Sequence, residues 1–268
     1  MIKPPHFHRL VILVLITITS TAARSEFVAI QAGQLPIILS APHGGQAEIP
    51  GVPPRKGAGI KKGASGFRTE RDVNADQLAV EVASALETKM GKKPYYVVAK
   101  FHRRFADANR PANIAYEDPK AGQIYDAYHQ ALARFCDAIH KNFGYGLVLD
   151  FHGQSSVRDT VFRGTQNGTT DHALVQRFGE KVHVGPNSFC GLLTTQGITV
   201  KPTDASRETA GFTGGYIVQT CGAREGIGAI QLEFGFDLRK KENLKTTAAK
   251  VADAIAAFAK LYLKSAGR

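Results

Sequence analysis

The chain has 268 residues, of which 43% are hydrophobic and 21% are charged, and its formal net charge is +11. This ordinary globular composition excludes a disordered or fibrous chain and suits one large α/β domain. The positive charge favours anionic partners such as acidic peptides, cell-wall polymers or nucleic acid, although it selects none of them and is also compatible with a role in solubility alone.

The N-terminus predicts a secretory signal peptide over residues 1–23. Lys3 and Arg9 precede an apolar run at residues 10–18, and small residues follow that run, which is the pattern of a signal peptide. The run is shorter than the roughly 20 apolar residues of a membrane-spanning helix, and an uncleaved anchor is the alternative. We therefore expect one mature domain over residues 24–268, a secreted or periplasmic location, and no stable membrane span after signal cleavage.

Short apolar runs along the chain predict buried strands, and amphipathic patterns between them predict helices. The expected strands cover residues 35–40, 95–99, 147–151 and 229–234. The expected helices cover residues 73–89 and 120–140, and a closing helix carries Val251, Ile255, Phe258 and Tyr262 on one face. Alternating strands and helices predict an α/β fold in which helices cover both faces of a sheet.

Residues 51–66 contain Pro53, Pro54, lysines and several glycines, a composition that predicts a loop. Both a functional loop and a solvated basic loop are compatible with this composition.

The three cysteines are Cys136, Cys190 and Cys221. An odd number without CxxC spacing excludes both a disulfide framework and a cysteine zinc site. At most one disulfide is possible, and export would favour a Cys190–Cys221 pair, because Cys136 lies in a predicted helix.

Two histidines follow predicted strands directly and are candidate metal ligands. His43 precedes Gly44 after the first strand, and His152 precedes Gly153 after the third. Ligands of open α/β sheets bind beyond the carboxyl edge of the strands, so the two histidines can converge there. Asp150 shares a strand face with His152 and is expected to orient the imidazole. The alternative is that Asp150 only ends the strand.

A hydrolytic zinc ion takes three protein ligands and leaves a position for water, so the two histidines require a carboxylate. Glu70, Asp72 and Asp76 are the candidates. Spacing does not choose among them, because acidic residues are also favoured at the start of a helix. Glu233 lies in an apolar strand and is the candidate general base. A buried salt bridge to an arginine is the alternative for Glu233.

The segment 102–111 contains Arg103, Arg104 and Arg110 together with Asn109. Arginine binds carboxylates through two parallel hydrogen bonds, so this segment is the expected anchor for an anionic end of a substrate. A surface cluster of ion pairs is the alternative.

Taken together, these motifs resemble the N-formylglutamate amidohydrolase family, whose members look like a trimmed version of the zinc carboxypeptidases. The resemblance covers about residues 35–236. The segment Ser40-Ala41-Pro42-His43-Gly44-Gly45 is similar to the family's Ser-x-Pro-His-small-Gly block. The segment Asp72-Val73-Asn74-Ala75-Asp76-Gln77-Leu78 is similar to its Asp-x-x-x-Asp-x-Leu helix start. The second similarity favours Asp72 over Glu70 as the acidic ligand, although a glutamate takes that role in the related carboxypeptidases.

Other segments carry the same resemblance. Arg103 and Asp107-Ala108-Asn109-Arg110 are similar to the family's Arg followed by Asp-x-Asn-Arg, in which the Asn-Arg pair is expected to grip the substrate carboxylate. Asp150-Phe151-His152-Gly153 resembles the Asp-x-His-small block, Gln231-Leu232-Glu233 resembles the segment with the catalytic glutamate, and Gly214-Gly215-Tyr216 resembles a loop at the substrate site. Gly44 and Gly153 replace residues that are usually alanine and serine in the deformylase branch. Those replacements and the export signal make the substrate, formylglutamate, less transferable than the chemistry.

The resemblance implies a mixed β-sheet of the zinc carboxypeptidase type and a zinc-dependent amidohydrolase that acts next to a carboxylate. Zn²⁺ would be held by His43, Asp72 and His152, with Glu233 as catalytic base. The substrate would meet Arg103 at the oxyanion, Asn109 and Arg110 at the carboxylate, and Tyr216 in the adjoining loop.

The expected partner is a small molecule or peptide with a free carboxylate. No nucleic acid is expected, because the basic residues are scattered without interleaved aromatic residues. Two alternatives remain: an exported metallocarboxypeptidase-like hydrolase of acidic peptides, cell-wall peptides or poly-γ-glutamate, and a non-catalytic carboxylate-binding protein. The sequence does not indicate the oligomeric state.

Overall fold

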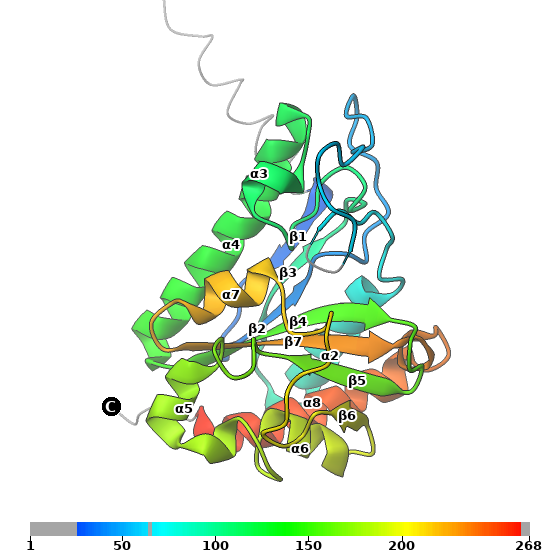
Figure 1. The fold of residues 1–268 in the computed structure, drawn as a ribbon. Helices are drawn as coiled ribbons and strands as arrows, with labels where there is room; N and C mark the ends of the chain where they lie inside the picture. Colours follow the sequence, from blue (N-terminus) through cyan, green and yellow to red (C-terminus); the bar gives the residue numbers. More distant parts are fainter. Residues whose placement is uncertain (1–25, 64–65, 264–268) are drawn as a thin grey trace, which may run out of the picture.

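The apolar runs of the chain form a mixed seven-stranded β-sheet (Figure 1). A computed structural model describes residues 26–63 and 66–263, so the predicted signal peptide at 1–23 lies outside the described residues. The strands are β1 (Val28–Gln31), β2 (Ile37–Ala41), β3 (Tyr95–Ala99), β4 (Gly146–Gln154), β5 (Thr160–Gly164), β6 (Thr199–Lys201) and β7 (Ile227–Gly235). Their order in the sheet is β1-β3-β2-β4-β7-β5-β6.

Helices cover both faces of this sheet, which confirms the predicted α/β class. The helices are α2 (Ala75–Met90), α3 (Ala112–Ala115), α4 (Pro119–Phe143), α5 (His172–Phe178), α6 (Phe189–Thr195), α7 (Tyr216–Gly222) and α8 (Leu244–Tyr262). One face packs against α2 and α8, with α6 beside α8, and the opposite face packs against α4 and α7 (Figure 1). In the start of α4, Asp118 accepts a hydrogen bond from the backbone N–H of Lys120, a favourable helix cap.

The central strands β3, β2, β4 and β7 run parallel to one another. Their carboxyl ends therefore meet at one edge of the sheet, where α/β folds place their ligands. Within this register Ser40 of β2 pairs with Asp150 of β4, and His152 of β4 pairs with Glu233 of β7. The backbone register alone therefore places polar residues of three strands next to one another.

Strand alternation explains why these polar residues share one face. Leu149 and Phe151 of β4 lie in the apolar cluster beneath α2 and α8. Val148, on the other face, packs in the second cluster with α4. Asp150 and His152 continue the Val148 face toward the carboxyl end, where that apolar cluster ends. Helix α4 thus covers the first half of the strands and leaves the second half for a site.

The four predicted strands and three predicted helices are confirmed as β2, β3, β4, β7, α2, α4 and α8. The strands that sequence patterns missed lie on the outer sides of the sheet and have only three to five residues: β1, β5 and β6.

The expected Cys190–Cys221 disulfide is wrong, because all three cysteines are free. Cys190 belongs to α6 and lies in the apolar cluster with α8, whereas Cys221 belongs to α7 and lies in the cluster on the opposite face of the sheet. A disulfide requires Cα atoms within about 7 Å, and the sheet separates these two residues. Cys221 lies instead beside Cys136 of α4, and both thiols are buried.

The loop predicted over residues 51–66 is confirmed in its described part. No helix or named strand begins there, and the only regular pairing is an isolated bridge between Lys62 and Phe67. Among the described helices, none is sufficiently long and apolar to cross a membrane.

Candidate metal centre and substrate cavity

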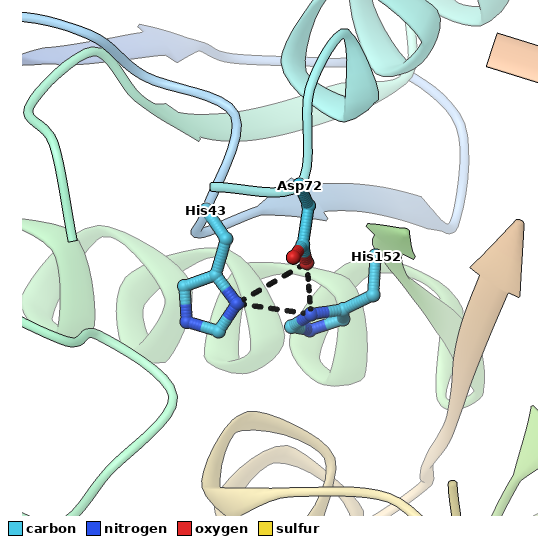
Figure 2. A group of neighbouring side chains, drawn as sticks. All are labelled: His43, Asp72 and His152. Atoms are coloured by element: carbon cyan, nitrogen blue, oxygen red, sulfur yellow. Dashed lines mark hydrogen bonds and ion pairs between the residues drawn. The ribbon is translucent and has the colours of Figure 1, made fainter. Parts of the chain in front are cut away.

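Three predicted ligands converge at the carboxyl edge of the sheet (Figure 2). His43 follows the end of β2, Asp72 precedes the first turn of α2, and His152 lies near the end of β4. The backbone N–H of Asp72 donates to the carbonyl of His43, which ties the two loops together. We refer to His43, Asp72 and His152 as the triad.

The donor atoms of the triad form a nearly equilateral triangle. His43 Nδ1 lies 3.1 Å from His152 Nδ1 and 3.3 Å from Asp72 Oδ2. The third side, from His152 Nδ1 to Asp72 Oδ2, measures 3.0 Å. In a tetrahedral zinc site, ligand bonds of about 2.0–2.1 Å separate neighbouring donor atoms by about 3.3–3.4 Å. The triad therefore fits a zinc ion with small adjustments.

Each histidine of the triad is oriented by a buried carboxylate on its other ring nitrogen. His43 Nε2 lies 2.7 Å from Asp107 Oδ1, and His152 Nε2 lies 2.8 Å from Asp150 Oδ2. An Nε2–H that donates to a carboxylate leaves Nδ1 with a free lone pair, which is the usual arrangement of metal-binding histidines. Two nitrogen lone pairs and a carboxylate oxygen then face a common centre, where a cation satisfies all three.

Electrostatics favour positive charge at this centre, whether a proton or a metal ion supplies it. Burial opposes charge on His152, but the carboxylates of Asp150 and Asp72 outweigh that effect and raise the pKa of His152 well above its usual value. Burial likewise opposes charge on Asp72, but its contacts with His152 and His43 hold the pKa of Asp72 well below its usual value. The donor set is thus suited to a divalent cation.

The hydroxyl groups of Ser40 and Tyr128 hold Asp150 in place. Ser40 Oγ donates to Asp150 Oδ1 at 2.7 Å, and the Ser40 hydroxyl lies 2.8 Å from the hydroxyl of Tyr128 on α4. All three groups are buried. The sequence prediction that Asp150 orients His152 agrees with this geometry.

Glu70, the alternative acidic ligand, lies outside the triad. Its side chain is 76% exposed and lies near Arg68. Asp76 also lies apart, packed against Gly44 at the start of α2. The structure therefore brings Asp72, and neither of the other two acids, to the histidines.

Glu233 lies on β7 in register with His152 and is 8% exposed. Gln231 Nε2 donates to Glu233 Oε1 at 2.9 Å. No cation of the described residues lies within salt-bridge distance of Glu233, so the alternative of a structural salt bridge has no support. Burial raises the pKa of Glu233 to about 7. A carboxyl group with that pKa is able both to accept and to donate a proton near neutral pH.

Arg103 is buried against the acidic residues around the triad. Its guanidinium donates to Asp107 Oδ2 at 2.6 Å and lies 3.8 Å from Asp72 Oδ1. Those two carboxylates raise the pKa of Arg103 although burial opposes its charge. Arg103 also lines the cavity beside the triad, so it links the metal centre to the space where a substrate would bind.

Asn109, Arg110 and Tyr216 all line the same cavity. Asn109 connects three segments: its Oδ1 accepts from the backbone N–H of Ile217 at 2.9 Å, and its Nδ2 donates to Gln231 Oε1 at 3.2 Å. Arg110 donates to the backbone carbonyls of Gly66 and Asn109. The residues predicted to bind substrate therefore line one cavity together with the triad.

The cavity beside the triad has a volume of about 1000 Å³, the upper end of the usual range for small-molecule sites. Five arginines line it: Arg68, Arg71, Arg103, Arg110 and Arg239. Its other charged lining residues, apart from the histidines, are Glu70, Asp72 and Glu233. The excess of arginine suits an anionic occupant.

Sequence analysis missed the roles of Asp107, Gln231 and Arg239. Asp107 and Gln231 stand inside the quoted family segments, so a buried acid or amide within a motif was the available signal. Arg239 had no such signal, because it follows β7 in a short 3-10 helix, Phe236–Arg239, beyond the matched motifs.

Comparison with known proteins supports the resemblance that the motifs indicated. Residues 118–238 match the family model described as N-formylglutamate amidohydrolase. That match includes Asp150, His152 and Glu233 but ends before Arg239. No curated protein sequence matches the chain significantly.

Solved structures share the fold at low sequence identity. An N-formylglutamate amidohydrolase from Ralstonia eutropha JMP134 aligns with a TM-score of 0.56 and 16% identity, over 88% of this chain and 98% of that one. A gene product of Agrobacterium tumefaciens aligns with a TM-score of 0.54 and 15% identity, over 90% and 96% of the two chains. These structures show that the chain has the same fold.

Proposed function

We propose that this chain is a zinc-dependent amidohydrolase that cleaves an amide bond next to a carboxylate, in a small N-acyl amino acid. The observation that carries the proposal is the triad of His43, Asp72 and His152 beside Glu233, at the base of an arginine-lined cavity. The match of residues 118–238 to the N-formylglutamate amidohydrolase family model supports the amidohydrolase class.

The triad would hold the zinc ion through two imidazole nitrogens and one carboxylate oxygen. A bound zinc ion supplies Lewis acidity, which lowers the pKa of a water molecule and polarises a carbonyl group. Glu233 would accept a proton from water in the cavity and donate it to the nitrogen of the leaving amine. Its pKa of about 7 suits both transfers. Gln231 holds Oε1 of Glu233, which orients the carboxylate for this role.

The arginines would bind and orient the substrate. Arg110 and Asn109 would hold the carboxylate next to the scissile amide, and Tyr216 would close the same side of the cavity. Arg103 would stabilise negative charge on the carbonyl oxygen, since a fixed cation acts most strongly where charge develops. Its hydrogen bond to Asp107 and its position near Asp72 hold the guanidinium rigidly for that purpose.

A longer acidic substrate, such as an acidic peptide, a cell-wall peptide or poly-γ-glutamate, is the second candidate. The large cavity and the half-exposed Arg68 at its rim favour it. Release of single residues from acidic peptides, compared with hydrolysis of N-acyl amino acids, separates the two substrate classes.

The buried Glu233 side chain favours a catalytic function over a function in carboxylate binding alone. A binding protein has no need for a buried acid with a pKa of about 7 and no cationic partner among the described residues, because burial of such a group is costly. The buried carboxyl group of Glu233 beside the triad suits proton transfer.

We also propose that the protein is exported, on the basis of the signal-like pattern in residues 1–23. Sequencing the N-terminus of the mature protein from an extracytoplasmic fraction tests this proposal. An intact N-terminus on protein confined to the cytoplasm would contradict it.

Metal analysis combined with hydrolysis assays tests the main proposal. We expect about one zinc ion per chain and hydrolysis of N-acyl amino acids by the purified protein. His43→Ala is expected to lose both zinc and activity. Loss of zinc with full retention of activity would overturn the proposal.

A further inference from the structure

Arg239 is a buried arginine that the motifs do not include. It ends the short helix after β7, is 4% exposed, and lines the cavity beside the triad. Burial lowers its pKa, while the nearby carboxylates of Asp72 and Glu233 oppose that shift. Arg239 therefore places a buried guanidinium in the same cavity as the triad.

Backbone carbonyls hold the guanidinium of Arg239 in a fixed position. Nε donates to the carbonyl of Phe234 at 2.9 Å, one Nη donates to the carbonyl of Gln154 at 3.2 Å, and the other donates to the carbonyl of Val73. Asn74 Nδ2 donates to the carbonyl of Arg239 itself at 2.8 Å. The side chain thus joins the ends of β4 and β7 to the start of α2.

Gly153 provides the space that the guanidinium occupies. A Cβ atom at Gly153 would lie 2.3 Å from Cζ of Arg239, far closer than van der Waals contact permits. Gly153 directly follows the triad residue His152, so the guanidinium lies against the strand that carries a metal ligand. The absence of a side chain at Gly153 therefore makes room for Arg239.

These contacts leave part of the guanidinium available. Arginine has five N–H donors, and the three bonds to carbonyls leave two, one on each Nη. No carboxylate of the described residues lies within salt-bridge distance of Arg239. Asp72 and Glu233 are its electrostatic neighbours, yet neither forms an ion pair with it. A buried, rigid cation that lines a cavity and lacks an anionic partner is suited to bind an anion from solution.

The other buried arginine next to the triad is already paired. Arg103 forms an ion pair with Asp107 at 2.6 Å. Arg71 differs again, because two of its donors bind the carbonyl of Gly44. Of these three arginines, Arg239 is the one that is buried, has no carboxylate of the described residues within salt-bridge distance, and keeps donors for a ligand.

We propose that Arg239 binds a carboxylate of the substrate, in addition to the carboxylate assigned to Asn109 and Arg110. This inference deepens the proposed function and rests on it. The preferred substrate then carries two anionic groups, one for Arg239 and one for Asn109 and Arg110. Arg239 acts as a specificity-determining residue that discriminates a dianionic substrate from a neutral analogue of equal size.

Matched substrates test this assignment. N-formylglutamate and N-formylglutamine have nearly the same shape and differ in the charge of the side-chain group. We expect the purified enzyme to show a lower KM for N-formylglutamate. Arg239→Met is expected to raise that KM roughly tenfold to one hundredfold, the range for hydrogen bonds to a charged group, with a smaller effect on kcat and on N-formylglutamine.

A second variant covers the possibility that Arg239→Met does not fold, since Arg239 also joins three segments. Gly153→Ala keeps the charge of Arg239 but displaces its guanidinium, because the added Cβ would overlap Cζ of Arg239. It is expected to raise KM for N-formylglutamate in the same direction. Arg158→Met is the matched control, because Arg158, like Arg239, lies over the ring of Phe236 but is half-exposed and outside the cavity lining.

A binding measurement separates this inference from the proposed function. Calorimetric titration with glutarate and with butyrate compares a dicarboxylate with a monocarboxylate without turnover. Glutarate binding that is tighter than butyrate binding and is lost in Arg239→Met supports the inference even if no amide is hydrolysed. Hydrolysis of N-formylglutamate and N-formylglutamine with equal KM, unchanged in Arg239→Met, overturns the inference and leaves the amidohydrolase proposal intact.

Discussion

The Nε2 atom of His43 lies 2.7 Å from Oδ1 of Asp107, a residue 64 positions further along the chain. The same carboxylate accepts a hydrogen bond from Arg103 through its other oxygen, at 2.6 Å. Asp107 is completely buried, and it connects the orientation of a candidate metal ligand to a cation that lines the cavity beside the triad. The charge and position of Asp107 are expected to affect both the orientation of His43 and the position of Arg103.

Asp107→Asn is expected to weaken zinc binding by roughly tenfold to one hundredfold, the usual cost of losing a partner of a metal-binding histidine. The asparagine has no negative charge, and its NH₂ group can donate to Nε2 of His43, which places the imidazole proton on Nδ1 and makes that atom less available to a metal. Competition with a chelator of known affinity measures the change. Asp237→Asn, at a surface ion pair with Arg158, is the control. Equal zinc affinity in the wild type and Asp107→Asn would contradict the prediction.

Zinc is expected to stabilise the folded chain, because the triad is assembled only after folding. A ligand at 100 times its Kd adds about 2.7 kcal/mol, or roughly 5–10 °C in Tm for a chain of this size. Thermal unfolding with zinc and with a chelator measures the difference. Asp72→Asn should abolish it, whereas Glu70→Gln should retain it, because the Glu70 side chain is exposed. The reverse result would make Glu70 the ligand.

Glu233→Gln is expected to lower kcat about 10²- to 10⁴-fold while zinc binding persists. Glutamine keeps the shape of the side chain but accepts no proton. Burial raises the pKa of Glu233 to about 7, and a general base acts when it is deprotonated, so kcat/KM should fall as the pH decreases through that range. A bound cation adds positive charge and moves this limb to lower pH. An unchanged acid limb in the residual activity of Glu233→Gln would exclude Glu233 as the base.

Gly44→Ala is expected to destabilise the fold by about 1–3 kcal/mol, the usual cost of overpacking. A Cβ at Gly44 would lie 2.3 Å from Oδ1 of Asp76, an oxygen that is buried without a hydrogen-bond partner. Burial also raises the pKa of Asp76. Asp76→Ala should therefore restore much of the loss in the double variant. Denaturant unfolding of the four proteins measures the coupling, and additive effects within about 0.5 kcal/mol would contradict it.

Sequence patterns determined the elements that position the site, because those elements depend on local periodicity. The apolar runs that became β2, β4 and β7 were recognisable, and each presents its polar residue at or beyond the carboxyl end. His43, His152 and Glu233 follow from that arrangement, since parallel strands end at one edge of the sheet. Strand alternation also placed Asp150 beside His152.

Only the tertiary structure decided which partners meet across long separations in sequence. It brought Asp72 to the histidines while Glu70 remained exposed, although the two acids stand two residues apart in a loop without periodicity. It placed Asp107 on His43 and Arg239 against Gly153. It also separated Cys190 from Cys221 by a sheet. Such contacts depend on loop conformation and on packing between layers, which local propensity does not encode.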